Sequence, residues 1–329
     1  MRLARKAKLT VEYRNLGNSG LQVSVVGLGC NNFGGRVDQA GTKAVIDQCI
    51  EEGITFFDTA DLYGGAGKSE EFMAPALKPH RRNVVIATKA SGPMGEGPYW
   101  RGTSRKYLIE AVDASLRRLD TDYIDLFQIH FPDPKTPIDE TLRALDDVVR
   151  SGKVRYIGNS NFAAWQVVEA DWVARAEHLT RFVSAQNEYS LLQRKIEPEL
   201  APACLKYGLG VLPFFPLASG FLTGKYRPNE TPPEGTRLGA ANSPFAGRIL
   251  NEGNFDMLVK LEKFAEDRGH TMIELAFSWL ASKPFVSSVI AGATRPEQVT
   301  QNAKSAEWKL TAEEFGEVDE IMGMAPAGR

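Results

Sequence analysis

Eight short hydrophobic runs, separated by segments of helical periodicity, constrain the fold of this 329-residue chain more than any other feature. Each run is rich in β-branched residues and bounded by turn-forming residues, which is typical of strands covered on both faces. Strand, helix, strand at this spacing predicts right-handed crossovers and a parallel sheet. The runs are VSVVGLG (23–29), ITFFD (54–58), VVIATK (84–89), YIDLFQIH (123–130), VRYIGNS (154–160), FVSAQNEY (182–189), GVLPFFPL (210–217) and VSSVIAG (286–292).

The intervening segments carry apolar residues at helical spacing. Segment 104–119 has an i, i+3, i+4, i+7 stripe, and Ser104 is placed to cap its start. Segment 138–150 repeats the stripe and stops before Gly152, and segment 271–281 shows it again. Eight strand–helix units within about 300 residues favour a closed (β/α)8 TIM barrel over an open sheet.

Three stretches interrupt the alternation. Residues 11–22 place Asn-Ser-Gly between short extended runs and predict a hairpin before the first barrel strand. Residues 91–103, after the third strand, and 219–254, after the seventh, predict long loops on the face where a barrel carries its active site. We expect residues 1–10 to form a disordered tail and residues 11–329 to form a single barrel domain.

Composition excludes several classes of partner. The net charge is −2, so nothing indicates binding of nucleic acid or an anionic membrane surface. No apolar run reaches the ~18 residues of a membrane-spanning helix, and the basic N-terminus lacks a signal-peptide core. The three cysteines (Cys30, Cys49 and Cys204) and the four histidines form no disulfide or metal-ligand spacing. We therefore expect a cytoplasmic protein without a metal site.

Four chemically active residues follow or end three of the predicted strands. Asp58 and Tyr63 follow residues 54–57, Lys89 follows residues 84–88, and His130 ends the fourth strand. A barrel brings the C-terminal ends of its strands together on one face, so these side chains should surround one pocket. Taken singly, each has a structural explanation, such as a turn partner, a surface charge or a rim histidine, but the shared position favours a site.

The four residues predict polarisation and protonation of a carbonyl group. A phenol with a pKa near ~10 is a poor acid at neutral pH, and a neighbouring Lys89 ammonium is expected to lower the pKa of Tyr63. Asp58 can hold the lysine charged, and His130 can donate a hydrogen bond to a carbonyl oxygen. The chain offers no evident protein nucleophile, so the nucleophile is expected to be a hydride from a cofactor.

The segment Gly64–Ser69 partly matches a phosphate-binding P-loop but fails its requirements. The full motif needs glycine where this chain has Leu62, and it needs a strand that leads directly into the loop. No Gly-x-Gly-x-x-Gly follows the first strand either. Nucleotide hydrolysis and a Rossmann site are therefore both disfavoured.

A second set of residues is suited to hold a dinucleotide. Ser160, Asn161 and Gln186 offer amide or hydroxyl groups for a carboxamide, and Phe214 offers a flat face for a ring. Two later segments suit phosphates. One carries a lysine, and the other begins a helix whose free N–H groups and arginine suit an anion. An ordinary strand-to-helix turn would show the same sequence pattern as the second segment. The residues of these segments are Leu217, Ser219, Gly220, Lys225, Gly292, Ala293, Thr294, Arg295, Gln298 and Asn302.

Together these motifs resemble the aldo-keto reductase family, from about Leu16 to about Asn302. Several independent motifs in the same order make the resemblance highly specific. The motifs are Asp58-Thr-Ala-Asp-Leu-Tyr63-Gly, Thr88-Lys89, Gln128-Ile-His130, Gly158-Asn-Ser160-Asn161, Gln186-Asn187, Pro216-Leu-Ala-Ser-Gly220 and Gly292-Ala-Thr-Arg295-Pro-Glu-Gln298.

The resemblance implies a barrel that binds extended NADPH, with Tyr63 as general acid assisted by the other three catalytic residues. It implies that Ser160, Asn161 and Gln186 hold the nicotinamide carboxamide while Phe214 stacks on the ring. Arg295 would meet the 2′-phosphate, with Gln298 and Asn302 near the adenine. The resemblance adds further residues to the cofactor set: Gly29, Cys30, Asn31, Asp58 and Pro216.

The chain departs from the family pattern at two positions. Phe214 replaces a tyrosine that often stacks on the nicotinamide, and Asn31 replaces a tryptophan that lines the pocket in many members. Aromatic walls around one polar anchor would suit small aromatic or aliphatic aldehydes, unless the rings simply pack in the loops. The residues expected to line the substrate pocket are Asn31, Phe33, Tyr99, Trp100, Phe131 and Phe215.

The sequence supports two competing functions. The first is an NADPH-dependent reductase that converts aldehydes, with ketones as further candidates, to alcohols. The alternative is a nucleotide-sensing regulatory subunit, because the family also includes channel-associated members; nothing in the C-terminal part indicates a dedicated partner module. The physiological substrate, the direction of reaction in the cell and the oligomeric state stay open.

Overall fold

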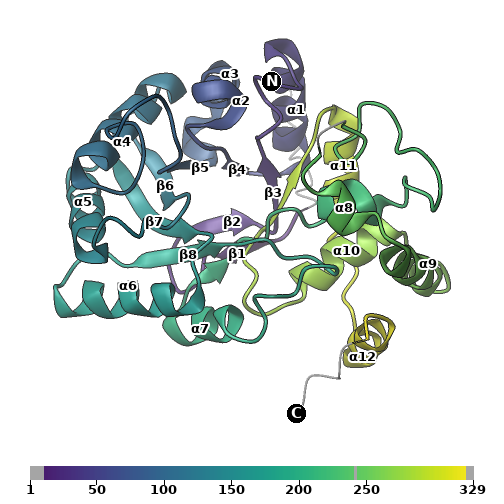
Figure 1. Cartoon of the computed structure of the whole chain (residues 1–329). Helices are drawn as coiled ribbons and strands as arrows, with labels where there is room; N and C mark the ends of the chain where they lie inside the picture. Colours follow the sequence, from purple (N-terminus) through teal and green to yellow (C-terminus); the bar gives the residue numbers. More distant parts are fainter. Residues whose placement is uncertain (1–10, 241–242, 324–329) are drawn as a thin grey trace, which may run out of the picture.

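Eight parallel strands form one sheet in the order β10-β3-β4-β5-β6-β7-β8-β9 in the computed structural model of the chain (Figure 1). The structure describes residues 11–240 and 243–323, so the predicted tail at residues 1–10 lies outside the described residues. The strands are β3 (Val26–Gly29), β4 (Phe56–Asp58), β5 (Val85–Ala90), β6 (Ile124–Ile129), β7 (Val154–Ser160), β8 (Phe182–Gln186), β9 (Gly210–Val211) and β10 (Val289–Gly292).

Backbone hydrogen bonds join the two ends of this sheet. The N–H of Val211 donates to the carbonyl of Phe285, and the carbonyl of Val211 accepts from Ser287. The N–H of Ile290 donates to Pro213, further toward the C-terminal face. The curled, eight-stranded parallel sheet confirms the predicted (β/α)8 barrel.

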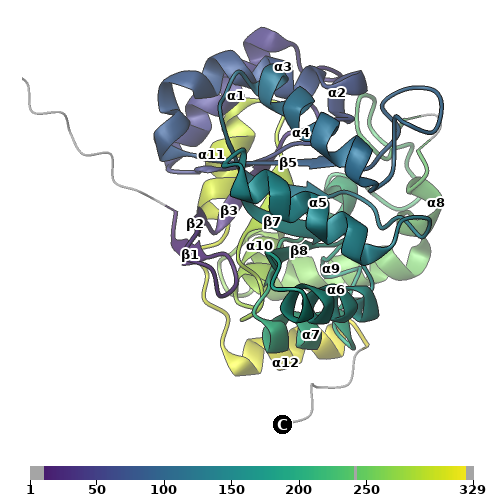
Figure 2. The ribbon, with the colours of Figure 1, turned by 90° about the vertical axis from the view of Figure 1, so that its left-hand side faces the viewer.

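Helices surround the sheet (Figures 1 and 2). Those that follow strands are α1 (Gln39–Glu52), α3 (Lys68–Leu77), α4 (Arg105–Leu119), α5 (Ile138–Arg150), α6 (Ala164–Ala176), α7 (Leu200–Tyr207), α10 (Met272–Ala281) and α11 (Pro296–Lys304). Shorter or additional elements are α2 (Tyr63–Ala66), the 3-10 helices η1 (Lys78–Asn83) and η2 (Ala218–Thr223), α8 (Ala246–Ile249), α9 (Glu252–Glu266) and α12 (Ala312–Ile321).

The three helices predicted from periodicity are confirmed. The hydroxyl of Ser104 accepts from the N–H of Tyr107 at the start of α4, as expected of an N-cap. Helix α10 begins one residue later than predicted because Thr271 caps it, in a capping box with Glu274. The predicted loop at 219–254 contains η2, α8 and the first residues of α9, so it is less irregular than its Gly and Pro content indicated.

The N-terminal hairpin is confirmed as β1 (Tyr13–Asn15) paired antiparallel with β2 (Gln22–Ser24). The hairpin covers the N-terminal mouth of the barrel, since Asn18 donates to the carbonyl of Gly208. The predicted strand 23–29 is therefore wrong in extent, because its first residues belong to the hairpin. The Ser24 hydroxyl accepts from the N–H groups of Thr55 and Phe56 at the bend between the two strands.

The seventh strand is also shorter than predicted. Strand β9 has two residues, and the segment beyond it reaches its neighbours only through isolated contacts such as the bridge between Glu188 and Phe214. Pro213 and Pro216 lack the N–H groups that a ladder needs. The chain therefore leaves the sheet early.

The barrel interior changes from apolar to polar along its axis. Phe56, Ala87 and Leu126 pack in one buried cluster with Leu16 of the hairpin, near the N-terminal end. Successive inward-facing side chains lie two residues apart on a strand. Two residues further along the same three strands come Asp58, Lys89 and Gln128, so strand alternation places polar groups at the C-terminal end. None of the described helices combines the length and apolar character required to cross a membrane.

Candidate active site

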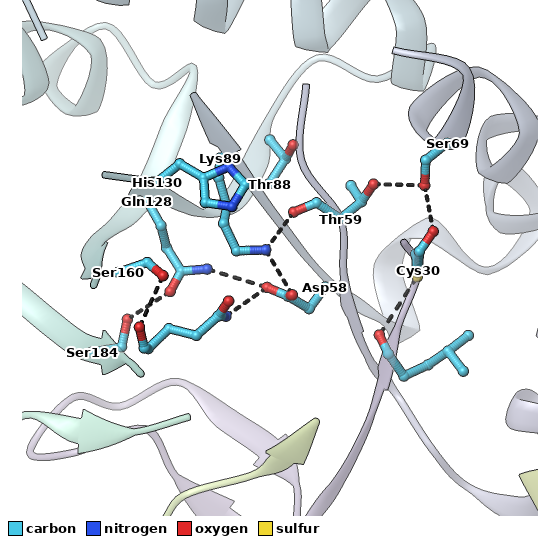
Figure 3. Close-up of polar contacts among 12 residues, drawn as sticks. Cys30, Asp58, Thr59, Ser69, Thr88, Lys89, Gln128, His130, Ser160 and Ser184 are labelled. Atoms are coloured by element: carbon cyan, nitrogen blue, oxygen red, sulfur yellow. Dashed lines mark hydrogen bonds and ion pairs between the residues drawn. The ribbon is translucent and has the colours of Figure 1, made fainter. Parts of the chain in front are cut away.

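A buried ion pair lies at the centre of the C-terminal face. The Lys89 Nζ atom is 2.7 Å from Oδ2 of Asp58 and 2.8 Å from the carbonyl oxygen of Thr59 (Figure 3). The two charged side chains are 0% and 4% exposed. The register pairs Asp58 with Ala87 and Lys89 with Gln128, so neighbouring strands bring these groups together.

Two glutamine amides satisfy the second oxygen of Asp58. Gln186 donates to Oδ1 at 2.8 Å. Gln128 donates to the same oxygen at 3.3 Å (Figure 3). Ser184 in turn donates to the amide oxygen of Gln128. Sequence reasoning did not assign Gln128 to the site; its position two residues after the inward-facing Leu126 was the available signal. Buried carboxylates remain charged when they are compensated in this way.

Tyr63 lies at the start of α2, beside the ion pair. The Lys89 Nζ atom is 5.0 Å from the centre of the phenol ring. Burial raises the pKa of Tyr63 and the Lys89 charge lowers it, with a net upward shift. The expected lowering of this pKa is therefore wrong for the protein alone, because desolvation outweighs the ammonium. Burial lowers the pKa of Lys89, but Asp58 and Tyr63 together outweigh it and hold the ammonium charged.

His130 follows β6 and contacts the same group of residues. Its ring lies edge-on to that of Tyr63, with the ring centres 5.7 Å apart. Its backbone bonds to both neighbouring strands, because its N–H donates to Ala90 and its carbonyl accepts from Asn161 at 3.0 Å. Burial and the Lys89 charge lower the pKa of His130 to about 3. The imidazole is therefore neutral at pH 7 and can donate a hydrogen bond without carrying charge.

The segment Gly64–Ser69, which partly matched a P-loop, supports the site through hydrogen bonds of Ser69. The hydroxyl of Ser69 donates to the carbonyl of Cys30 at 2.9 Å and lies 2.8 Å from the hydroxyl of Thr59 (Figure 3). Gly64, Gly65 and Gly67 have φ between 71° and 103°, which explains why glycine is used there. This segment thus joins the ends of β3 and β4 instead of cradling a phosphate.

The residues expected at the nicotinamide form a connected network. Ser160 donates to the carbonyl of Gln186 at 2.8 Å, and Asn161 donates to the Ser160 hydroxyl. Because the Gln186 amide nitrogen is used by Asp58, its oxygen is the atom of that amide suited to a further donor. Asn161 adopts a left-handed φ of 61°, which asparagine tolerates better than most residues.

Gly29 ends β3, and Cys30 and Asn31 follow it next to Asp58. Gly29 is in register with Asp58, and the N–H of Cys30 donates to the carbonyl of Asp58. The side-chain oxygen of Asn31 accepts from Arg237, at 3.4 Å. Arg237 is a further site residue that sequence reasoning missed. Its position inside a loop rich in Gly and Pro carried no periodic signal.

Arg237 is a cation without an acidic partner in the described part of the chain. Its guanidinium also bonds to the Asn32 oxygen and lies 5.0 Å from the ring centre of Phe215. Burial and the nearby Arg36 both lower the pKa of Arg237. Two cations that repel one another without a carboxylate between them provide a favourable place for an anion.

The segment after β9 places Phe214 half-buried, with its ring edge-on to that of Phe215. Pro216 and Leu217 lead into η2, where Ser219 and Gly220 have positive φ. The hydroxyl of Ser219 is buried and has no hydrogen-bond partner in the described structure. Lys225 is exposed, and its amine lies so close to Gly220 that a Cβ there would be 2.8 Å from it.

The β10–α11 turn carries the remaining phosphate-directed residues. Arg295 is the N-cap of α11 and its side chain is 69% exposed, with one weak contact to Glu297. Gln298 accepts from both the N–H and the hydroxyl of Thr294. Asn302 is buried, Ala293 is buried, and Gly292 is exposed. The turn thus presents one largely exposed arginine, Arg295.

The six residues expected in the substrate pocket differ in whether they lie at the site. Phe131 stacks on His130 with ring centres 4.3 Å apart, and Phe215 and Asn31 lie near Arg237. Phe33, in contrast, is fully buried in the core, so its ring does not reach the surface of the site. The rings of the loop after β5, Tyr99 and Trp100, are 64% and 54% exposed.

Comparison with known proteins agrees with this geometry. The family model described as Aldo/keto reductase family matches residues 25–322. A probable voltage-gated potassium channel subunit beta from Oryza sativa is 38% identical, over 96% of this chain and 98% of that protein. The versiconal hemiacetal acetate reductase of Aspergillus parasiticus is 35% identical, over 94% of this chain and 96% of that protein.

A second probable potassium channel subunit beta, from Arabidopsis thaliana, is 39% identical over 90% of this chain and 92% of its own length. The chain belongs to the aldo/keto reductase family. Its relatives include both oxidoreductases and proteins named as channel subunits.

Proposed function

We propose that this protein is an NADPH-dependent reductase that converts aldehydes, and also ketones, to alcohols. One observation carries the proposal: the Lys89 ammonium is buried between Asp58 and Tyr63, with a neutral His130 beside the phenol. Holding a buried cation next to a phenol is costly, and it is useful where a phenolate must form.

In the proposed reaction Tyr63 gives its proton to the substrate's carbonyl oxygen. The Lys89 ammonium stabilises the phenolate that remains, and Asp58 keeps that ammonium in place. His130 donates a hydrogen bond to the same carbonyl oxygen and orients it. NADPH, when bound, supplies the hydride.

Polar groups of the described chain that are unpaired, lack an acidic partner or are largely exposed fit such a cofactor. The Ser219 hydroxyl, Arg237 and the exposed Arg295 would hold phosphates, while Asn161 and Gln186 would hold the carboxamide. An open cavity of about 510 Å³, which none of the catalytic side chains lines, lies by Arg36 and Thr294. We place the adenosine end of the cofactor toward it. The three buried thiols fit the proposed cytoplasmic location.

Turnover measured by loss of NADPH absorbance with a simple aromatic aldehyde tests this function. Tyr63→Phe removes the proton donor and keeps the ring, so activity should fall by about 10²- to 10⁴-fold. NADPH affinity, measured by fluorescence titration, should stay nearly the same. A variant as active as the wild type would show that the mechanism is wrong.

Cofactor preference depends on Arg295 in this proposal. Arg295→Ala should raise the Kd for NADPH about 10-fold or more and change that for NADH little, because only NADPH carries the 2′-phosphate. Equal losses for both nucleotides would show that Arg295 does not read that phosphate. Lys225→Ala is the matched comparison: it would affect both nucleotides alike if Lys225 meets the pyrophosphate.

A second candidate function is a nucleotide-sensing regulatory subunit. It is supported by the relatives from Oryza sativa and Arabidopsis thaliana that are named as potassium channel subunits. Single-turnover hydride transfer much faster than steady-state turnover, with a stable protein partner, would favour it. Fast steady-state turnover without a partner would favour the reductase.

A further inference from the structure

The imidazole of His130 is held by rings and not by a hydrogen bond to its second nitrogen. Nδ1 is buried and has no partner among the described residues. A functional histidine is ordinarily oriented by a hydrogen bond at that position. Here Phe131 stacks on one face of the ring, 4.3 Å away and 7° from parallel. Tyr63 meets the ring edge-on at 82°.

Phe131 is in turn fixed by Ser91, the first residue beyond β5. The N–H of Phe131 donates to the Ser91 hydroxyl at 2.8 Å, and that hydroxyl lies 3.1 Å from the Phe131 carbonyl. Ser91 has a φ of 127°, in a region that favours glycine. Such strain costs on the order of 1–3 kcal/mol and persists only where surrounding contacts enforce it. The Ser91 carbonyl also accepts from Gly102, which anchors the returning loop.

We propose that Ser91 and Phe131 are positioning residues that fix the plane of the His130 imidazole and shield one of its faces from water. Phe131 thus has a role besides its predicted place in the wall of the substrate pocket. The inference rests on the proposed reductase function, in which His130 must be a neutral hydrogen-bond donor aimed at the carbonyl oxygen.

The groups that face His130 allow the effect of the stacked ring to be distinguished from the effect of nearby charges. Lys89 approaches from β5 and Tyr63 from α2, and Asp58 of β4 reaches His130 only through Lys89. Asn161, which follows β7, is neutral. The Lys89 charge opposes protonation of the imidazole whether or not Phe131 is present. A change in the His130 titration on substitution of Phe131 therefore reflects the loss of the stacked ring.

The test is an NMR titration of the ring nitrogens in the full-length protein labelled at its four histidines, with His130→Gln to assign the signal. In the wild type His130 should stay neutral down to about pH 5. Phe131→Ala should move the onset of protonation upward by at least about 1 pH unit, because water reaches the ring. Phe131→Tyr keeps a flat ring and should behave like the wild type.

Ser91→Ala and Ser91→Gly should both shift the titration in the same direction, by less than Phe131→Ala. The glycine variant should be the more stable of the two because it relieves the φ strain. Trp165→Ala removes an exposed aromatic from the outer helix α6 and should leave the His130 titration unchanged. Wild-type titrations in both Ser91 variants would overturn the role of Ser91.

A His130 titration unchanged in Phe131→Ala would overturn the whole inference. If the other three histidines keep their wild-type chemical shifts, the Phe131→Ala variant is folded. If it is not folded, Phe131→Leu keeps most of the side-chain volume and decides the question. The titration needs no turnover, so failure of the reductase proposal would be seen separately, as a wild type that reduces no carbonyl. In an active protein, kcat of Phe131→Ala should fall at acid pH where that of Phe131→Tyr does not.

Discussion

At the residue scale, the pair of Asp58 and Lys89 shows what a buried charge requires. Each partner has lost nearly all contact with water, and the desolvation cost is offset only by the ion pair and by donors such as Gln186. The pair is therefore weak evidence for stability and stronger evidence for function, because an apolar replacement of both residues would fold equally well.

Lys89→Met should lower the free energy of unfolding by about 3–5 kcal/mol, because it leaves the Asp58 carboxylate buried and unpaired. The double variant Asp58→Asn/Lys89→Met should recover most of that loss and remain inactive. Urea denaturation followed by circular dichroism measures both. Lys43→Met breaks an exposed pair and should change stability by less than about 0.5 kcal/mol. A single variant as stable as the wild type would mean that Asp58 is neutral or solvated.

The convergence of the candidate catalytic side chains could be predicted from sequence, whereas the shifts in their pKa values could not. Tyr63, Lys89 and His130 converge as their positions at or after the C-terminal ends of barrel strands indicated. The pKa of Tyr63 nevertheless moves upward, because the extent of burial depends on the complete fold. Arg237 escaped prediction for a similar reason, because the contacts of its guanidinium are decided by segments distant in sequence.

At the scale of elements, local chemistry predicted helices better than strand ends. Helices α4 and α5 match their predicted ranges to within one residue, because caps and periodicity are local signals. Strand ends depend on which neighbour supplies hydrogen bonds. The short β9 and the division of 23–29 between β2 and β3 follow from pairing and from proline positions.

Gly158→Ala should separate β7 from β8 at the site. A Cβ at Gly158 would lie 2.1 Å from the Ser184 hydroxyl and 3.2 Å from Gln128, so one strand must shift. We expect a loss of about 1–3 kcal/mol in the free energy of unfolding, together with lower activity. Gly316→Ala, in the open interior of α12, should instead raise stability by up to about 1 kcal/mol. Equal effects would contradict the crowding argument.

At the scale of the whole molecule, the net charge of −2 does not show which carboxylates are buried, and burial makes stability depend on pH. Asp61 and Glu70 are both buried, and Arg118 is paired to Glu70 at 2.6 Å. Burial and the Glu70 charge raise the pKa of Asp61 to about 7, while Arg118 and the Tyr107 hydroxyl oppose the shift. The folded protein therefore binds a proton that the unfolded chain releases near its ordinary pKa of 3.8.

This linkage makes stability fall as pH rises. Because the folded pKa of Asp61 is raised, its unfavourable contribution is absent below about pH 4, grows as pH rises toward 7, and is constant above that. Asp61→Asn should be more stable than the wild type at pH 8, by on the order of 1–3 kcal/mol, and nearly equal near pH 4. Urea denaturation at both pH values measures this. The exposed control Asp47→Asn should show no such pH-dependent difference, and a constant offset in Asp61→Asn would mean no coupled proton.

The sequence by itself determined the order of strands and helices, the closed barrel and the face that carries Asp58, Tyr63, Lys89 and His130. Strand and helix periodicities and helix caps depend on residues close together in sequence, so they can be recognised from the sequence alone. The tertiary structure alone decided burial, and with it the charge states, the neutral His130, the inward packing of Phe33 and the lack of an acidic partner for Arg237 among the described residues. These depend on contacts between segments up to some 200 residues apart, such as the one between Asn31 and Arg237.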